Sequence, residues 1–471
     1  MATLSTALGN LTSALDAEQS ALNVTANNVS NASTTGYTRE IPNFEENPSV
    51  TLNGVSYGAG VTMAGGVSQR DLVLNQRVQQ QTQLQSAAAS RLTALNDLQS
   101  YFTPASSTSS TASAGNIGAD ISTFFSSFTK LESNPSDNSL RENVLSTATT
   151  LSSDVSNTAE SISSQRSSLN QQVLSVVSQV NSLSSSLAQL NQQIQSTSPN
   201  QDAGTLEDQR QQDLLQLSQL IGINTTTTEG NGMTVTTTGG AVLVTEGQSY
   251  ALNATVSSGM YQITASGTDI TSGLASGGGS LGGLLTARDT DLPTVSAQLD
   301  QMAFAISNAV NNQNNSGSDI NGNSGNENLF VSPTQIAGSA ANMSVVMTDP
   351  GRIAAASLGA GPGDDTNAVA MAAMAKSQIV NGTSTASDSY SNLVTGLGSL
   401  VTETQNQNTA LTASVSQLTS LNSSASSVDL NEEAAQMTTF ERAYQAASQA
   451  FNILNQAYAS ALNLGQSTAV S

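Results

Sequence analysis

One short pattern in the sequence could hold a nucleophile. Gly278-Gly279-Ser280-Leu281-Gly282 fits G-x-S-x-G, in which the serine attacks a carbonyl carbon after a histidine has taken its proton. The chain of 471 residues contains no His and no Cys, so neither that base nor a thiol nucleophile can be supplied. We therefore interpret the pattern as a glycine-rich connection into a helix. We expect no catalytic residue, no cofactor and no enzyme activity.

Two further patterns resemble ligand-binding loops. Asp319-Ile320-Asn321-Gly322-Asn323 begins like a calcium loop, but Ser324 and Phe330 stand where such a loop needs Gly and Glu. Residues 359–363 resemble a phosphate loop, but Pro362 has no N–H to donate and no Lys follows closely. We expect a turn and a linker at these places, and no metal site.

The charge balance excludes some classes of partner. The chain has 12 Lys and Arg against 34 Asp and Glu, a net charge of -22, whereas nucleic-acid binders gather basic residues on one face. Its apolar stretches are far shorter than the ~18 residues that a membrane span needs. The N-terminus also lacks the compact apolar region of a secretory signal. We expect no nucleic-acid partner, no membrane insertion and no cleaved signal peptide.

Apolar residues recur at steps of three and four at both ends of the chain, a pattern typical of helices that pack at a shallow angle. The N-terminal seam consists of Leu4, Leu8, Leu11, Leu15 and Leu22. The C-terminal seam consists of Met437, Phe440, Tyr444, Phe451, Leu454, Tyr458 and Leu462. Because these seams hold few apolar side chains for so many residues, we expect both ends to be mobile in the monomer and to fold on assembly.

Interior segments repeat the helical pattern. A helix over about residues 69–102 is predicted from Leu92, Leu95, Leu98 and Phe102. A second is predicted from Val173, Val176, Val180, Leu183, Leu187, Leu190 and Ile194. A third follows Tyr390, Leu393, Leu397, Leu400, Thr404, Gln407, Leu411, Val415 and Leu418. Residues 290–312 are expected to form a further helix.

Between residues 223 and 270 the apolar period changes to two. Val242 and Val244 alternate with polar neighbours, and Gly239-Gly240 and Ser258-Gly259 supply turns, which indicates antiparallel strands. The predicted fold class is mainly α with a β insertion. It is a long-helix, coiled-coil-like rod formed by paired N- and C-terminal segments, with a small antiparallel β outer domain.

The patterns divide the chain into six parts. In chain order we expect an N-terminal core helix (1–40), an extended connector (41–68), the first part of a helical domain (69–215), a β-rich outer domain (216–284), the second part of the helical domain (285–428) and a C-terminal core helix (429–471).

Both ends also carry motifs. Ala26-Asn27-Asn28-Val29-Ser30-Asn31, with Thr35-Gly36-Tyr37, resembles the N-terminal signature of bacterial flagellar rod, hook and hook-associated proteins. Residues 428–435 and 440–446 resemble the matching C-terminal signature. The asparagines are expected to end a helix in the left-handed conformation and Gly36 to take a positive φ. Asp429 and Glu432 are expected to form a capping box. As assembly residues we select Asn27, Asn28, Val29, Asn31, Gly36, Tyr37, Asp429, Glu432 and Glu433, together with the two seams.

Interior motifs narrow the resemblance to the family of hook-associated protein 1. They lie at residues 133–137, 206–210, 279–289, 319–322 and 353–356. The resemblance implies a structural protein of the flagellum that leaves the cell by type III export and joins the hook to the filament. The implied partners are further copies of the chain in a ring or helix, the hook protein, the second hook–filament junction protein, an export chaperone and the type III export apparatus. The implied location is extracellular.

Other functions stay open at this stage. Another flagellar axial protein, from the hook or the distal rod, would share the terminal motifs. An exported surface adhesin would present the Ser- and Thr-rich strands as a binding face. An enzyme with paired carboxylates has no supporting spacing in this sequence.

Overall fold

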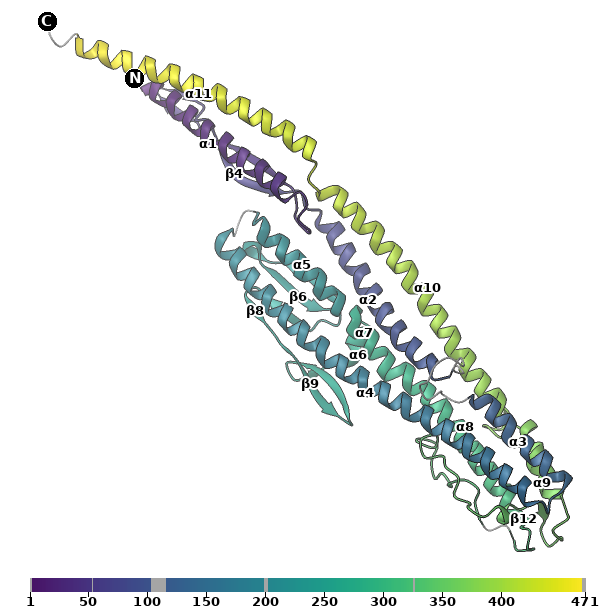
Figure 1. The fold of residues 1–471 in the computed structure, drawn as a ribbon. Helices are drawn as coiled ribbons and strands as arrows, with labels where there is room; N and C mark the ends of the chain where they lie inside the picture. Colours follow the sequence, from purple (N-terminus) through teal and green to yellow (C-terminus); the bar gives the residue numbers. More distant parts are fainter. Residues whose placement is uncertain (1, 53, 103–115, 199–201, 325–326, 468–471) are drawn as a thin grey trace.

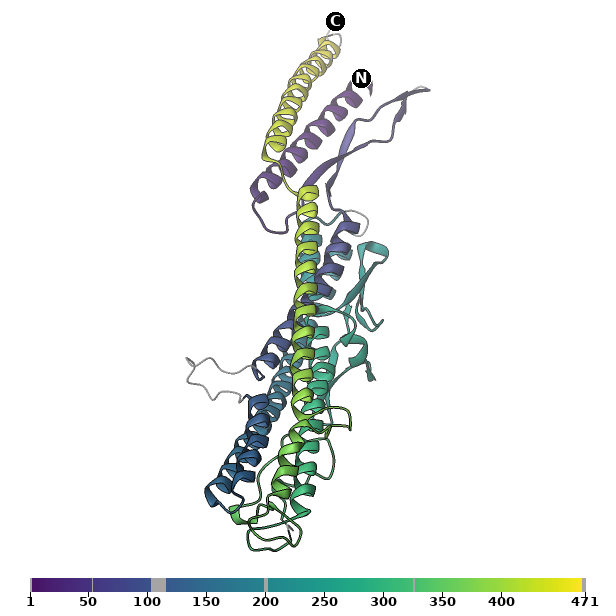
Figure 2. The same cartoon turned by 90° about the vertical axis from the view of Figure 1, so that its right-hand side faces the viewer.

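The computed structural model describes residues 2–52, 54–102, 116–198, 202–324 and 327–467. The molecule is a long rod, and both ends of the chain lie at the same tip (Figure 1). A slender terminal segment at that tip continues into a thicker helical shaft (Figures 1 and 2). The predicted fold class, mainly helical with paired terminal helices and small antiparallel sheets, is confirmed.

The helices make up most of the rod. In chain order they are α1 (Ala2–Asn31), α2 (Leu72–Ser100), α3 (Ile117–Ser133), α4 (Asn138–Thr197), α5 (Thr205–Leu220), α6 (Thr271–Ala275), α7 (Gly279–Thr286), α8 (Leu292–Asn315), α9 (Thr366–Ala373), α10 (Ala386–Ser426) and α11 (Leu430–Ser467). A π turn at Ala287–Asp291 joins α7 to α8. Several of these helices begin with a residue that caps them. The capping side chains, which each accept a hydrogen bond from a backbone N–H of the first turn, belong to Asp71, Asn116, Asp137, Thr385 and Asp429.

The shaft is built around α4, which has 60 residues and spans about 90 Å. One continuous apolar core runs along it and includes Val144, Leu151, Val173 and Ile194, all fully buried. Helices α3 and α5 pack on α4, and α2 pairs lengthwise with α10. The seam predicted between residues 173 and 194 lies in the second half of this helix.

The predicted interior seams are largely confirmed, with one correction. Leu92, Leu95, Leu98 and Phe102 are buried in the core at α2 and just beyond it. On α10, Tyr390, Leu393, Leu397 and Thr404 are buried, whereas Leu400, Leu411, Val415 and Leu418 are half-buried. Gln407 is exposed and Asn408 takes its place, with its Oδ1 accepting a hydrogen bond from Gln85 Nε2 at 3.2 Å. The step after Thr404 is thus four residues rather than three.

The strands form separate antiparallel sheets. They are β1 (Glu40–Glu46), β2 (Val50–Leu52), β3 (Val55–Tyr57), β4 (Val61–Ser68), β5 (Ile223–Thr227), β6 (Met233–Thr237), β7 (Val242–Thr245), β8 (Gln248–Ser249), β9 (Leu252–Ser257), β10 (Met260–Ala265), β11 (Thr268–Asp269), β12 (Gly317–Ser318) and β13 (Ala356–Ser357). Strands β5 to β8 follow one another in one sheet, and β9 to β11 form a second.

These two sheets lie along α4 and share its core, so they are part of the shaft rather than a domain outside it. Three asparagines spaced about three turns apart on α4 bind their backbones. Asn170 Oδ1 accepts the amide of Tyr261 at 2.9 Å. Asn181 bonds both the N–H and the C=O of Leu252, and Asn191 donates to the carbonyl oxygens of Met233 and Glu246. Backbone groups of the strands are therefore satisfied by the helix.

Residues 40–68 fold into a long β-hairpin instead of the extended connector expected from the sequence. β1 pairs with β4 over seven residues, with a bulge between Asn43 and Phe44, and β2 and β3 pair at the outer end. The hairpin packs on α1. Asn10 Nδ2 of α1 donates to the Gly58 carbonyl oxygen at 2.8 Å.

At the opposite tip of the rod, Arg141 joins two of the interior motifs. It is 1% exposed, and it donates to the carbonyl oxygens of Pro135 and Ile353. Asp319 forms the turn expected in its loop, since its carboxylate accepts the amides of Asn321 and Asn323. The Gly279 motif forms the expected helix entry, with φ of 71° at Gly279.

Two carboxyl groups meet where α3 packs on α4. Asp120 Oδ2 is buried without a donor from the described residues, and the Asp154 side chain lies against it. Burial, the contact with Asp154 and its charge raise the pKa of Asp120 to about 6. Asp120 therefore holds a proton only below about pH 6, and above that pH two carboxylates face each other between α3 and α4.

This pair predicts a pH dependence of stability. Because the folded-state pKa of Asp120 is raised, its stabilising contribution is present below the unfolded value and is lost as the pH rises through about 6. We expect Asp120→Asn to raise the thermal midpoint at pH 7 and to flatten its change between pH 4 and 7, as measured by circular dichroism. Glu142→Gln, at an exposed position on α4, is the control. A variant with the same pH slope as the unaltered chain would contradict the assignment.

Candidate assembly site at the joint of the terminal segments

The terminal segment consists of α1, the hairpin and α11. Helices α1 and α11 pack lengthwise, and the hairpin runs along α1 (Figure 2). The hairpin also reaches α11, because the ring of Phe44 in β1 lies 6.1 Å from that of Phe440. The predicted N-terminal seam, Leu4, Leu8, Leu11, Leu15 and Leu22, is half-buried throughout. In the C-terminal seam Met437, Phe440, Phe451, Leu454 and Tyr458 are half-buried, while Tyr444 and Leu462 are 37% and 44% exposed.

The most deeply buried stripe of α1 is not the leucine seam. It consists of Ala17, Ala21, Thr25 and Asn28, which are small or polar. Large apolar side chains on both helices thus keep part of their surface in water. The structure brings the two seams together, but neither is covered as the shaft core is.

Asn28 is the centre of the N-terminal motif. Its side chain is buried, and its Nδ2 donates to the Glu40 carbonyl oxygen at 2.7 Å and to Glu433 Oε2 at 3.0 Å. Its Oδ1 accepts from the Tyr37 hydroxyl at 2.8 Å and from the Glu40 amide at 3.0 Å. Both donors and both lone pairs of the amide are therefore used. One side chain therefore connects α1, the turn at residues 32–39 and the start of α11. We call this meeting point the joint.

The prediction that the motif asparagines take the left-handed conformation is wrong. Asn27, Asn28 and Asn31 all lie within α1, and the positive φ falls on Gly36, at 81° as predicted. Asn31 Nδ2 donates to the Asn27 carbonyl oxygen, one turn earlier in the helix, at 3.1 Å. Asn27 Nδ2 donates to the Tyr37 hydroxyl, and Val29 is 39% exposed.

Arg39 completes the joint with α11, and the sequence analysis did not select it. Its Nε lies 2.6 Å from Glu433 Oε1, and its Nη2 lies 2.8 Å from Glu432 Oε1. Burial alone would lower the pKa of Arg39, but the two carboxylates outweigh it and raise the pKa above its ordinary value. Glu433 is 0% exposed, and Arg39 and Asn28 both contact its carboxylate. The available signal was that Arg39 is the first cation in the chain, among acidic residues.

The capping box is formed only in part. Asp429 precedes α11, and its Oδ1 accepts the Asn431 amide at 2.8 Å. Glu432 reaches Arg39 instead. The residue expected to close a local cap thus makes a contact to residues about 390 positions away.

The other half of the joint fastens the hairpin to the shaft. Asp208 accepts the amide and the hydroxyl of Thr38 at 2.9 and 2.7 Å. Arg70, two residues after β4, pairs with both Asp208 and Glu207 of α5. The backbone amide of Arg39 also donates to the carbonyl oxygen of Ser426, the last residue of α10. The interior motif at 206–210 is therefore the shaft's side of the joint.

Tyr37 lies between the two halves. Burial, and then the charges of Glu40, Asp208 and Glu433, raise its pKa well above the ordinary value. Its hydroxyl therefore keeps its proton and donates to Asn28 Oδ1.

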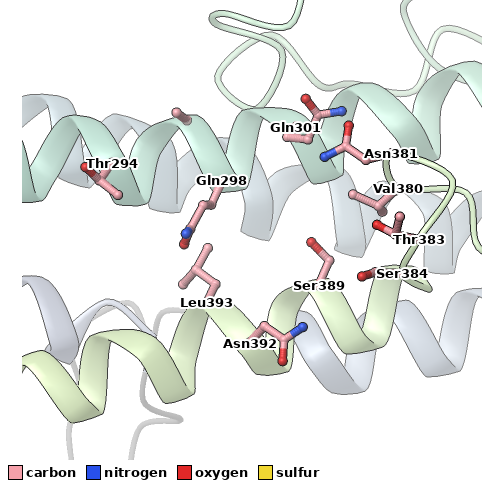
Figure 3. Close-up of a pocket in the computed structure, with 11 residues that line it drawn as sticks. Thr294, Gln298, Gln301, Val380, Asn381, Thr383, Ser384, Ser389, Asn392 and Leu393 are labelled. Atoms are coloured by element: carbon pink, nitrogen blue, oxygen red, sulfur yellow. The ribbon is translucent and has the colours of Figure 1, made fainter.

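The joint binds segments of the chain together and offers no reactive group. Its buried carboxylates are paired with arginines, and no cluster of three metal-ligating residues occurs among the described residues. A groove of about 550 Å³ lies elsewhere, between α8 and α10, and hydroxyls, amides and aliphatic groups line it (Figure 3). Within the described part of the chain, no helix is both long and apolar enough to cross a membrane.

Known proteins are similar in sequence to this chain along most of its length. Residues 106–330 match the family described as flagellar hook-associated protein FlgK helical domain, and residues 8–38 match flagella basal body rod protein. Flagellar hook-associated protein 1 of Escherichia coli (strain K12) is 26% identical over 98% of this chain and 100% of its own length. The chain is similar to flagellar hook-associated protein 1 along nearly its whole length. The Bacillus subtilis (strain 168) member is also 26% identical, over 92% of this chain and 93% of its own.

A solved structure shares the fold. The flagellar hook junction protein FlgK from Burkholderia pseudomallei superposes with a TM-score of 0.65 and 20% identity. The superposition covers 74% of this chain and 100% of the Burkholderia pseudomallei chain. The fold of this rod is therefore shared with a solved structure.

The joint predicts a specific weakness. Arg39→Met leaves the Glu433 carboxylate buried without its cation, and breaking a buried pair in this way costs about 3–5 kcal/mol. We expect chymotrypsin to cut the variant at Phe440 and Tyr444 at least about tenfold faster than the unaltered chain. Arg442→Met, on the same helix but exposed, is the matched control for the free chain. Equal cleavage of both variants would show that the pair does not hold α11.

Proposed function

We propose that this chain is a structural component of the bacterial flagellum that joins the hook to the filament. The observation that carries the proposal is the similarity to flagellar hook-associated protein 1 over 98% of this chain and all of the Escherichia coli relative. The folding of both chain ends into one segment at one tip supports it, since one element can then contact neighbouring copies (Figure 1).

The half-covered seams suggest how the junction forms. Leu4 to Leu22 on α1 and Met437 to Leu462 on α11 leave apolar surface exposed in the single chain. Burial of this surface against neighbouring copies would favour association. In this proposal the terminal segments form an inner tube as a ring or helix of copies. The shaft lies outside it, and the hook protein and the second hook–filament junction protein contact its two ends.

Export comes before assembly in this proposal. The chain leaves the cell through the type III export apparatus, without a cleaved signal peptide, and functions outside the cell. The absence of Cys suits a chain that must pass through in an unfolded state without cross-links. An export chaperone bound to the C-terminal region would cover the Met437–Leu462 seam until then. The role is structural, with no reaction catalysed.

A second candidate is another axial protein of the hook or distal rod. The match of residues 8–38 to flagella basal body rod protein favours the axial class in general. The match of residues 106–330 to the FlgK helical domain favours the junction within that class.

A deletion strain tests the role. Electron microscopy is expected to show hooks without filaments, and the culture medium is expected to contain unassembled flagellin. Expression of the unaltered gene should restore filaments, which controls for effects on neighbouring genes. Loss of the hooks themselves would assign the protein to the rod or hook, and intact filaments would leave the adhesin reading.

A further inference from the structure

Asn-Gly pairs occur at four places in the sequence, at residues 53–54, 231–232, 321–322 and 381–382. In such a pair the side-chain amide carbon of the asparagine lies near the backbone nitrogen of the glycine, and glycine has no side chain to shield that nitrogen. Asn53 lies outside the described residues. The other three pairs can be compared in the structure.

Asn381 and Gly382 are the central residues of a tight turn. The Thr383 and Ser384 amides both donate to the Val380 carbonyl oxygen, at 3.1 and 3.2 Å, and the Val380 amide donates back to Ser384 at 3.0 Å. The φ angles are 52° at Asn381 and 68° at Gly382, and positive values at both central residues are typical of a type I′ turn. Both residues are exposed, so the ends of the turn are fixed while its centre is open to water.

The peptide group between Asn381 and Gly382 can rotate without loss of a hydrogen bond. Neither the Gly382 N–H nor the Asn381 carbonyl oxygen has a hydrogen-bond partner among the described residues. Rotation of this one group converts a type I′ turn into a type II′ turn, which keeps the positive φ at Asn381 and the closing hydrogen bond. Glycine accepts the new φ at the second position. The Gly382 nitrogen is therefore able to turn toward Asn381 Cγ.

The other two described pairs lack this freedom. The Gly322 N–H donates to the Asp319 carbonyl oxygen at 3.1 Å, and the Gly232 N–H donates to the Glu229 carbonyl oxygen at 3.4 Å. In each pair that hydrogen bond must break before the glycine nitrogen can approach the side chain. The fold thus distinguishes three pairs that are the same in sequence.

We propose that Asn381 is a site of spontaneous deamidation, selected by the fold over the other two described Asn-Gly pairs. The Gly382 nitrogen bonds to Asn381 Cγ, and its proton leaves with the side-chain nitrogen as ammonia, which closes a five-membered succinimide ring. Water then opens the ring: its hydroxyl bonds to one of the two ring carbonyl carbons attached to the nitrogen, and its proton returns to that nitrogen. The product at position 381 is aspartate or isoaspartate. This inference is independent of the proposed function.

The reaction changes the groove between α8 and α10. Asn381 lines this groove together with Gln301 of α8 and Ser389 of α10, and all of its lining residues are uncharged (Figure 3). Either product adds one carboxylate, so each converted copy carries one negative charge more than the unaltered net charge of -22. Isoaspartate also lengthens the backbone by one carbon atom shortly before Thr385, whose side chain caps α10.

Peptide mapping by mass spectrometry tests the site. The purified chain is incubated at mildly alkaline pH in water labelled with heavy oxygen, so that opening of the ring marks each new carboxyl group. We expect conversion at Asn381 to exceed conversion at Asn231 and at Asn321 by at least about fivefold, the factor that one hydrogen bond contributes to a local equilibrium. In the chain unfolded by guanidinium chloride the three asparagines should convert at similar rates, because the turns are lost.

Matched variants provide a second readout. Both carry Asn53→Gln, so that the pair outside the described residues does not contribute. Asn381→Gln should remove most of the ammonia release and of the more acidic form seen on isoelectric focusing, because the longer side chain no longer closes a five-membered ring. Asn321→Gln is the control and should leave both nearly unchanged, with circular dichroism as the check on folding. Faster conversion at Asn231 or Asn321 in the folded chain, or a lead of Asn381 that persists after unfolding, would overturn the proposal.

Discussion

The ion pair between Arg39 and Glu433, closed by Asn28, is the interaction on which the rest of the structure depends. It joins the turn after α1 to the start of α11, so residues about 390 positions apart become one local unit. Because Glu433 is fully buried, loss of Arg39 would leave an uncompensated buried charge and strongly destabilise the folded chain. The Arg70 pairs with Asp208 and Glu207 extend the unit to the shaft. The chain passes between the terminal segment and the shaft twice at this place, after β4 and after α10, and each passage has a polar anchor.

The two sides of the joint are stabilised differently. The shaft surrounds α4 with a closed core and uses Asn170, Asn181 and Asn191 to fix the sheets to it. The terminal segment has no comparable core, because α1 uses Ala17 and Ala21 where it lies deepest and leaves its leucines half-covered. In the proposed function, neighbouring copies cover the apolar surface that the terminal segment leaves exposed. This asymmetry is what a subunit of a larger tube requires.

Sequence periodicity predicted the helices where apolar residues recur without long gaps, as in residues 173–194 and 390–404. It did not predict α3 or the first half of α4, although Val144, Ala148, Leu151, Val155 and Ile162 recur there at steps of three, four and seven residues and are buried. Alternation and glycine turns identified the strands between residues 223 and 270, but not their attachment to α4. That attachment depends on side-chain amides that bind backbone groups, and residue spacing carries no sign of it.

Only part of the candidate site was predicted, because its contacts also join residues that are far apart in the sequence. Asn28, Tyr37, Glu432 and Glu433 were selected from motifs, yet their meeting depends on contacts between the two ends of the chain. Arg39, Thr38 and Asp208 were not selected, because a buried ion pair between distant residues leaves no local pattern. The local roles assigned to the asparagines and to Glu432 were wrong because tertiary partners took their hydrogen-bonding groups.

The most direct measurement is hydrogen exchange along the terminal helices, in the free chain and in the assembled junction. In the dilute free chain we expect protected amides near the joint, at residues 25–31 and 433–440, and fast exchange toward the tip, at residues 4–15 and 450–462. In the junction both regions should be protected as strongly as α4. Uniform protection of α1 and α11 in the free chain, at the level of α4, would contradict the claim that neighbouring copies complete the fold.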